Sequence, residues 1–267
     1  MLKVGSRPWA AVAVLCIGLA AGLTGCGGDD EESAADVTAA CDAHVGVVTG
    51  FNTVFSTIQL PDNGPPPPEF KGQLQAAYDA NVAQPLATLV ADAPDEVKDE
   101  IEEISRKTAQ FRDEADPSIL DDDFEKLTDK VDAYMQEHCA GVKATVEAVN
   151  YAYRGLPSTL PATTTIRIEF RNTADEAHEM LVLTRKPGVT ETFDQILALP
   201  PDQIESKFDF VNAESANPGQ TGYLIGTLPA GDYIFLCSFG KGTTDDNDPK
   251  QDQPHFTLGM KQEVKVA

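Results

Sequence analysis

The sequence predicts an α+β protein of several domains, with a four-helix bundle over residues 37–141 and an antiparallel Greek-key β-sandwich over residues 142–267. Two observations predict this fold class. Apolar residues recur at helical spacing through the first segment, and at Val142 the period changes to the alternation of a half-buried strand. With 267 residues, the chain is also long enough for each domain to bury a core of its own.

Residues 1–25 have the pattern of a secretory signal peptide, in which a short basic start precedes the apolar segment Trp9 to Leu23. This segment is shorter than the roughly 20 residues that cross a bilayer. It ends in Leu23-Thr24-Gly25-Cys26, which resembles the lipobox of bacterial lipoprotein precursors. The resemblance implies cleavage before Cys26, lipid attachment to its sulfur and anchoring on the extracytoplasmic face of the cell membrane. Ordinary secretion with cleavage near Ala21 is the alternative.

Residues 26–36 are expected to form a flexible tether, because glycines and adjacent carboxylates favour a solvated chain. The whole chain is strongly acidic, with 43 acidic and 20 basic side chains and a formal net charge of −23. A surface of this charge repels nucleic acid, so we expect no nucleic-acid partner.

Four helices are expected between residues 37 and 141, because apolar residues repeat there at helical spacing. They lie at 37–58, 70–89, 94–111 and 124–138. Pro65 to Pro68 form a stiff connection after the first helix, and Pro85 is expected to kink the second. Asp121-Asp122-Asp123 offers an N-cap for the fourth helix. The mostly short connections favour an antiparallel bundle.

Cys41 and Cys139 lie near the start of the first helix and the end of the fourth, which an antiparallel bundle places at the same end. We expect a disulfide between them, because such bonds form outside the cytoplasm, and this pairing leaves Cys237 as a free thiol. A Cys2His2 metal site that includes His44 and His138 is the alternative. Adjacent helical residues point about 100° apart, which disfavours His138 and Cys139 as joint ligands. With the disulfide, both histidines are expected to be half-buried.

The second segment is expected to contain short strands separated by turns. They lie at 142–148, 164–171, 180–184, 222–227, 233–238 and 262–266. Residues 192–208 instead show helical spacing, which Pro200-Pro201 interrupts. Short strands and turn signals such as Pro229-Ala230-Gly231-Asp232 favour an antiparallel sandwich with Greek-key connections.

Four residues of the second segment, His178, Cys237, His255 and Met260, have the donor atoms of a type 1 copper site. Two imidazoles, one thiolate and one thioether suit copper better than Mg²⁺ or Ca²⁺. The spacing His255-x4-Met260 can turn both side chains toward one ion from a short loop before the last strand. We therefore expect one copper ion at these four residues.

The segments Ala177-His178-Glu179-Met180 and Leu228 to Cys237, followed by His255-x4-Met260, occur in the order found in cupredoxins. By these motifs, residues 142–267 resemble a cupredoxin domain. The resemblance implies that Cys237 supplies the short thiolate bond, that the two histidines supply the imidazoles, and that Met260 is the weak axial ligand.

Two features depart from the family pattern. Glu179 stands where copper-binding members commonly have Asn, a residue that ties the ligand loops together. The connection from Ser238 through Pro254 is longer than usual, and its polar sequence is expected to be mobile.

The resemblance implies one-electron transfer or copper handling at the outer membrane face, with a redox or metal-transport protein as partner. The sequence contains no Gly-rich phosphate loop and no Gly-x-Ser-x-Gly motif, so we expect no enzyme activity. A metal-free cupredoxin-like adaptor lipoprotein is the main alternative, in which Cys237 is a small buried apolar group. A role in metal uptake is a third, weaker alternative.

Overall fold

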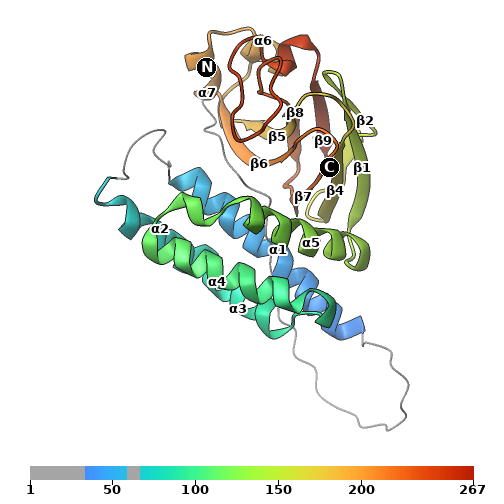
Figure 1. Cartoon of the computed structure of the whole chain (residues 1–267). Coiled ribbons are helices and arrows are strands. Elements are labelled where there is room, and N and C mark those ends of the chain that lie inside the picture. Colours follow the sequence, from blue (N-terminus) through green and yellow to red (C-terminus); the bar gives the residue numbers. More distant parts are fainter. Residues whose placement is uncertain (1–33, 59–66) are drawn as a thin grey trace.

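The structure, a computed structural model, describes residues 34–58 and 67–267, and its helical part lies beside a β-sandwich (Figure 1). The helices are α1 (Ala34–Thr57), α2 (Phe70–Asn81), α3 (Ala83–Ala91), α4 (Lys98–Glu114) and α5 (Asp122–His138). Two 3-10 helices, η1 (Asp95–Val97) and η2 (Pro117–Ile119), precede α4 and α5. No helix within these described ranges has the length and apolar character needed to cross a membrane. Cys26 and the predicted signal peptide lie outside the described residues.

The prediction of four helices is not confirmed, because the second predicted helix is divided at Val82 into α2 and α3. Pro85 lies in the first turn of α3, where its missing N–H leaves no helical hydrogen bond unmade. Val82 still donates to Tyr78 O at 2.8 Å and accepts from Leu86 N–H at 2.9 Å, so the two helices follow each other directly. The helix therefore breaks at Val82, three residues before Pro85, the residue at which the kink was expected.

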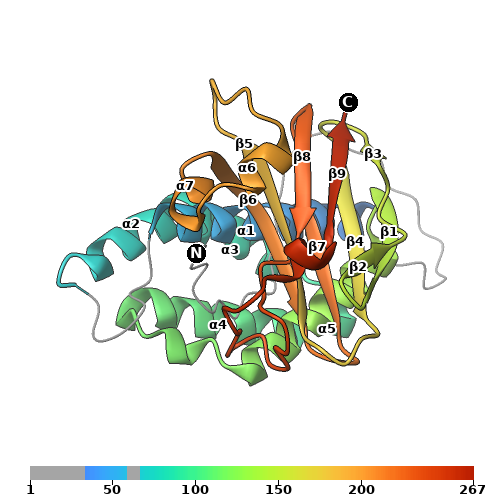
Figure 2. The ribbon, with the colours of Figure 1, turned by 90° about the horizontal axis from the view of Figure 1, so that it is seen from above.

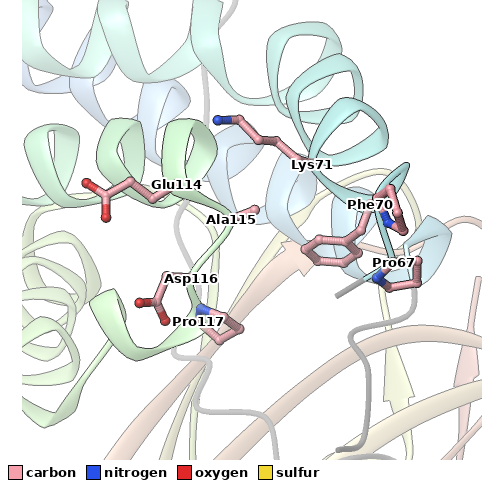
Figure 3. A pocket seen from close by; sticks show the side chains of 8 residues that line it. Pro67, Phe70, Lys71, Glu114, Ala115, Asp116 and Pro117 are labelled. Carbon is pink, nitrogen blue, oxygen red and sulfur yellow. The ribbon is translucent and has the colours of Figure 1, made fainter. Parts of the chain in front are cut away.

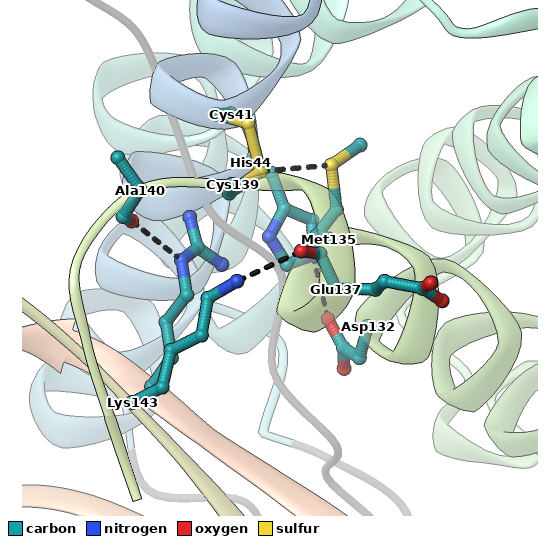
Figure 4. Close-up of a disulfide and its surroundings, with 9 residues drawn as sticks. Cys41, His44, Asp132, Met135, Glu137, Cys139, Ala140 and Lys143 are labelled. Carbon is teal, nitrogen blue, oxygen red and sulfur yellow. Dashed lines mark hydrogen bonds and ion pairs between the residues drawn. A yellow bond between two sulfur atoms is a disulfide. The ribbon is translucent and has the colours of Figure 1, made fainter.

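The predicted disulfide between Cys41 and Cys139 is present and joins α1 to the end of α5 (Figure 4). The expectation of two half-buried histidines is wrong. His44 is fully buried, and its Nε2 lies 2.5 Å from Oδ1 of the buried Asp132. His138 is exposed in the last turn of α5 and stacks on Tyr134. The two histidines differ because one lies on the inner face of its helix and the other on the solvent side.

Two sheets form the β-sandwich (Figure 2). The first has the order β2 (Ala152–Arg154), β1 (Val142–Val149), β4 (Thr165–Asn172) and β7 (Thr221–Thr227). The second has the order β3 (Thr159–Leu160), β9 (Lys261–Val266), β8 (Gly231–Leu236), β5 (His178–Arg185) and β6 (Phe208–Ala216). The prediction of purely antiparallel sheets is wrong, because β1 pairs with β4, and β3 with β9, in parallel.

The predicted helical segment 192–208 is interrupted at Pro200-Pro201, as the sequence predicts. Helices α6 (Phe193–Leu197) and α7 (Pro201–Glu205) flank this interruption, and α6 packs Phe193 and Ile196 against the outer face of β5 and β8. Strand β6 was not predicted, because Asp209, Asn212 and Glu214 interrupt its apolar pattern. A further 3-10 helix, η3 (His255–Leu258), precedes β9.

The helical part packs on strands β6 and β7, which are the edge strands of the two sheets (Figures 1 and 2). Helix α1 contacts both strands, and α5 contacts β7. Asn52 of α1 donates to Asn212 Oδ1 at 2.9 Å, and Asn212 in turn donates to the Ile225 carbonyl at 2.9 Å. The helices therefore cover the seam between the two sheets, and a buried amide bridges it.

Several carboxylates from different elements lie along this seam. Burial, followed by repulsion from Asp132 and Asp246, raises the pKa of Asp129 to about 7. Burial, followed by repulsion from Asp246, raises the pKa of Glu125 to about 7. The Glu214 side chain is 3% exposed, and burial followed by repulsion from Asp129 raises its pKa well above the usual value. The seam therefore favours protonated carboxyl groups.

We expect Asp129→Asn to stabilise the protein at pH 8. Asp129 retains its proton up to about pH 7 in the folded state but loses it near pH 4 when unfolded. Its contribution to stability therefore falls as the pH rises from about 4 to about 7. The advantage of the variant should disappear as the pH falls through the same window.

Thermal unfolding at a series of pH values measures this difference. Asp99→Asn, at an exposed position in the first turn of α4, is the matched control and should gain no stability at pH 8. Equal unfolding temperatures for Asp129→Asn and wild type at pH 8 would contradict the prediction.

Replacing Cys41 and Cys139 together with alanine should destabilise the protein by about 2–5 kcal/mol, because the disulfide closes a long loop in the unfolded chain. The two cysteines are 98 residues apart in the sequence. Denaturant unfolding followed by circular dichroism measures the loss. Wild type treated with reductant should reproduce it, whereas a loss of less than about 1 kcal/mol would argue against this role.

Candidate metal centre

Three donor side chains from distant parts of the chain meet in the interior of the sandwich. His178 is the first residue of β5, Cys237 directly follows β8, and His255 is the first residue of η3. Strands β5 and β8 are antiparallel, with Leu181 opposite Leu236, so the start of β5 lies beside the end of β8. This register brings His178 next to Cys237.

The three donor atoms have the spacing of ligands around a single ion. Nδ1 of His178 lies 3.0 Å from Nδ1 of His255, and Cys237 Sγ lies 3.9 Å and 3.3 Å from these two nitrogens. In the plane of the three atoms, one point is equally far from all of them, at about 2.0 Å. This distance is close to the bonds of about 2.0–2.3 Å that imidazole and thiolate make to Zn²⁺. In the part of the chain that the structure describes, these three side chains form a group with metal-ligand spacing.

Burial sets the protonation of the three donors, each of which is 0% exposed. It lowers the pKa of His178 to about 4, with a smaller effect from His255, and it also lowers the pKa of His255. Both imidazoles are therefore neutral at pH 7 and retain a lone pair for a metal. Burial raises the pKa of Cys237 well above the usual value, so a metal that binds its sulfur must displace the thiol proton.

Met260 is connected to these donors through the backbone. Cys237 N–H donates to Met260 O at 3.1 Å, and Met260 N–H donates to His255 O at 3.0 Å. Gly259 has a φ of 118°, which side-chain-bearing residues rarely adopt, and it lets the chain turn from η3 into β9. The Met260 side chain is fully buried in the same core cluster as Cys237. All four predicted ligand residues therefore belong to one region of the fold.

Glu179 ties the two ligand strands together at the position where the family pattern has Asn. Its Oε1 accepts a hydrogen bond from Ser238 N–H at 2.7 Å and another from the Ser238 hydroxyl. Its own N–H donates to Cys237 Sγ at 3.3 Å. The two hydrogen bonds from Ser238 give Glu179 the tying role expected of Asn at this position, and the backbone donor to sulfur favours the thiolate form.

The long connection from Ser238 to Pro254 is tied down by backbone hydrogen bonds, although its polar sequence was expected to be mobile. Gly240 N–H donates to Lys250 O at 2.7 Å, and Thr243 is fully buried. Thr243 O accepts a hydrogen bond of 2.8 Å from the N–H of Ala177, the residue before His178. The loop therefore folds back against the β4–β5 connection instead of leaving the ligands unsupported.

Two residues that the sequence analysis did not identify contact His255. Glu176 Oε2 lies 3.0 Å from His255 Nε2 and accepts from Gly242 N–H at 2.5 Å. Tyr151 donates its hydroxyl to Glu176 Oε1 at 2.9 Å. Burial opposes ionisation of Glu176, but these hydrogen bonds outweigh it and lower the pKa, so the group is a carboxylate. In the sequence Glu176 lies two residues before His178, but nothing in the residue pattern marks it as a partner of His255.

Other cavities among the described residues have different linings. One of about 530 Å³ lies between the start of α2 and the end of α4, beside Phe70 and Glu114 (Figure 3). A second of about 450 Å³ lies between α5 and the loop after β8, beside Asp129 and Asp245. Neither lining contains histidine or cysteine, so neither offers the donors of a soft-metal site.

No protein-family model and no curated protein sequence matches the chain. Similar solved structures include a reduced auracyanin from Roseiflexus castenholzii, at 26% identity over 48% of this chain and 98% of that chain, with a TM-score of 0.32. Auracyanin A of Chloroflexus aurantiacus, described as a blue copper protein, is 22% identical over 47% and 98%, with a TM-score of 0.30. Rusticyanin of Thiobacillus ferrooxidans is 17% identical over 47% and 77%, with a TM-score of 0.30.

The donor set of this chain fits a type 1 copper ion. Two neutral imidazoles and one ionisable thiol point at a common centre, and a buried methionine follows in the adjoining loop. These soft and borderline donors match copper, whereas Mg²⁺ and Ca²⁺ require oxygen ligands. This assignment depends on the donor geometry and chemistry of the chain itself.

Glu179→Ala should weaken copper binding by about 10- to 100-fold, the usual cost of removing a group that orients a metal ligand. The loss follows from the missing hydrogen bonds to Ser238, which hold the residue after Cys237 in place. Titration against a competing chelator measures the affinity. Glu179→Gln retains an oxygen acceptor and should bind copper within a few-fold of wild type. Equal losses in both variants would show that charge, and not the hydrogen bonds, is decisive.

Proposed function

We propose that this protein binds one copper ion through His178, Cys237, His255 and Met260 and transfers single electrons. The carrying observation is the convergence of two Nδ1 atoms and one sulfur, all buried, on a point about 2.0 Å from each, the length of a metal–ligand bond. A metal-free adaptor would not require three such donors to face one another.

The residues of the chain would hold the ligands in place through both oxidation states. The bound copper supplies one-electron redox chemistry by alternating between Cu(I) and Cu(II). Cys237 and Met260 are fixed by their mutual backbone hydrogen bond, and Glu179 restrains the residue after Cys237. A site whose ligands are already positioned needs little rearrangement when the electron arrives or leaves.

Burial favours electron transfer over copper delivery. All three donors facing the centre are 0% exposed, so a copper ion cannot pass to a partner unless the site opens. An electron needs no such opening. A redox protein is therefore the partner that we propose, rather than a metal-transport protein.

The location that we propose is the extracytoplasmic face of the cell membrane, with a lipid on Cys26 as the anchor. The Leu23-Thr24-Gly25-Cys26 sequence supports this location. The disulfide between Cys41 and Cys139 supports a compartment outside the cytoplasm, because such bonds are rarely stable in the cytosol. A redox protein of the same membrane would be within reach of the anchored domain.

Adding Cu(II) to the purified mature protein should produce an intense visible band from thiolate-to-copper charge transfer. Absorption spectroscopy and metal analysis should give one copper per chain. Cys237→Ser should abolish the band, because the sulfur is the donor of the transition. His138→Ala, at an exposed histidine of α5, is the control and should retain it. A wild-type protein that stays colourless and binds no copper would refute the proposal.

A further inference from the structure

The two ligand histidines differ in how their outer ring nitrogens are held. His178 Nε2 is buried and has no hydrogen-bond partner among the protein atoms described. His255 Nε2, in contrast, lies 3.0 Å from Glu176 Oε2. Both rings direct Nδ1 at the common centre. Binding of one ion there therefore does not by itself require that only one of the two Nε2 atoms has a hydrogen-bond partner.

Glu176 is itself held in place from several sides. Its two carboxylate oxygens accept hydrogen bonds from Gly242 N–H and from the Tyr151 hydroxyl. Its backbone carbonyl accepts from Asn172 Nδ2 at 2.8 Å, and Asn172 is 2% exposed. The side chain therefore reaches His255 from a fixed backbone position, with three donors arranged around its carboxylate.

Tyr151 covers the same side of the site. Its ring centroid lies 4.9 Å from that of His255 and 6.4 Å from that of His178, and the residue is only half-buried. Asn150 and Tyr151 have φ values of 28° and 63°, in the left-handed region that favours glycine. Bulky residues rarely adopt this conformation, so the turn keeps an aromatic ring over the histidines at an energetic cost.

We propose that Glu176 is a positioning residue that keeps His255 in the tautomer with hydrogen on Nε2 and the lone pair on Nδ1, and that Tyr151 closes the solvent side of this contact. The inference deepens the proposed copper function and rests on it for its redox consequence. The Nε2–H of His255 donates to the carboxylate, and Nδ1 is thereby left as the acceptor that faces Cys237.

The Glu176 carboxylate should also change the relative stability of Cu(II) and Cu(I) at the site. A hydrogen-bonded carboxylate makes an imidazole a stronger electron donor, which favours Cu(II) over Cu(I). Glu176 and Tyr151 together would also keep small anions from reaching a bound copper past His255. Both effects would be lost if the pair were removed.

The first experiment uses metal-free protein labelled with ¹⁵N-histidine. The nitrogen NMR spectrum of wild type at pH 7.5 should show His255 as a single Nε2–H tautomer. Glu176→Ala should show a mixture of the two tautomers, and Glu176→Gln, whose amide oxygen still accepts, should restore the wild-type pattern. An Nδ1–H tautomer in wild type, or no change in Glu176→Ala, would overturn the inference.

The second experiment uses copper-loaded protein. Glu176→Ala should bind Cu(II) about 10- to 100-fold more weakly than wild type, with a smaller loss for Cu(I). Each tenfold difference between the two losses raises the reduction potential by about 59 mV, which voltammetry measures. Glu205→Gln, an exposed carboxylate on α7, is the control for a simple change of charge and should leave the potential unchanged.

The role of Tyr151 is tested by comparing Tyr151→Phe with Tyr151→Leu. The phenylalanine variant keeps the ring and loses the hydrogen bond to Glu176, whereas the leucine variant loses both. Azide should bind to the copper of Tyr151→Leu and of Glu176→Ala, as new charge-transfer absorption, and not to that of wild type. Azide binding to wild type would refute closure of the site.

Failure of this inference is distinguishable from failure of the proposed function. If Glu176→Ala keeps the wild-type tautomer, affinity and potential while wild type shows the blue band, copper binding stands and the positioning role is refuted. If wild type binds no copper, the proposed function fails, and the tautomer measured in metal-free protein still decides whether Glu176 orients His255.

Discussion

The antiparallel pairing of β5 with β8 is the constraint on which the metal centre depends. It sets His178, at the start of one strand, beside Cys237, at the end of the other. The third donor is added to this pair by backbone hydrogen bonds, since His255 N–H donates to Phe239 O at 2.8 Å and Phe256 N–H donates to Cys237 O at 2.9 Å. A slip of one residue in this register would turn alternate side chains to the opposite face and separate the donors.

The helical part stabilises the fold at a different place, along the seam between β6 and β7. Its disulfide uses two of the three cysteines in the described residues, and Cys237 remains free and buried. This division of the cysteines suits a thiolate ligand in an oxidising compartment, because a free thiol with a nearby cysteine partner would be open to oxidation. The buried carboxyl groups of the seam belong to the contact between the two parts, and His178, Cys237 and His255 do not take part in it.

Much of the fold could be predicted from local patterns. The helical spacing of apolar residues located three helices directly, and alternation located six of the nine strands of the sandwich. The parallel pairing of β1 with β4 could not be predicted, because periodicity identifies a strand but not its neighbour. Strand β6 was missed because its polar residues, including Asn212 and Glu214, face the helical part and not water. The division at Val82 lies three residues before Pro85, the local signal from which a kink was expected.

The proposed ligand set could be chosen from the sequence alone, because copper chemistry selects residue types and His178, Cys237, His255 and Met260 are few and distinctive. Their supporting residues were decided by the tertiary structure. Glu176 and Tyr151 are ordinary in the sequence, and Glu179 departs from the family pattern, yet all three contact the ligands or their neighbours. The physical reason is that metal ligands are recognisable by their chemistry, whereas a hydrogen-bond partner is defined by where the backbone places it.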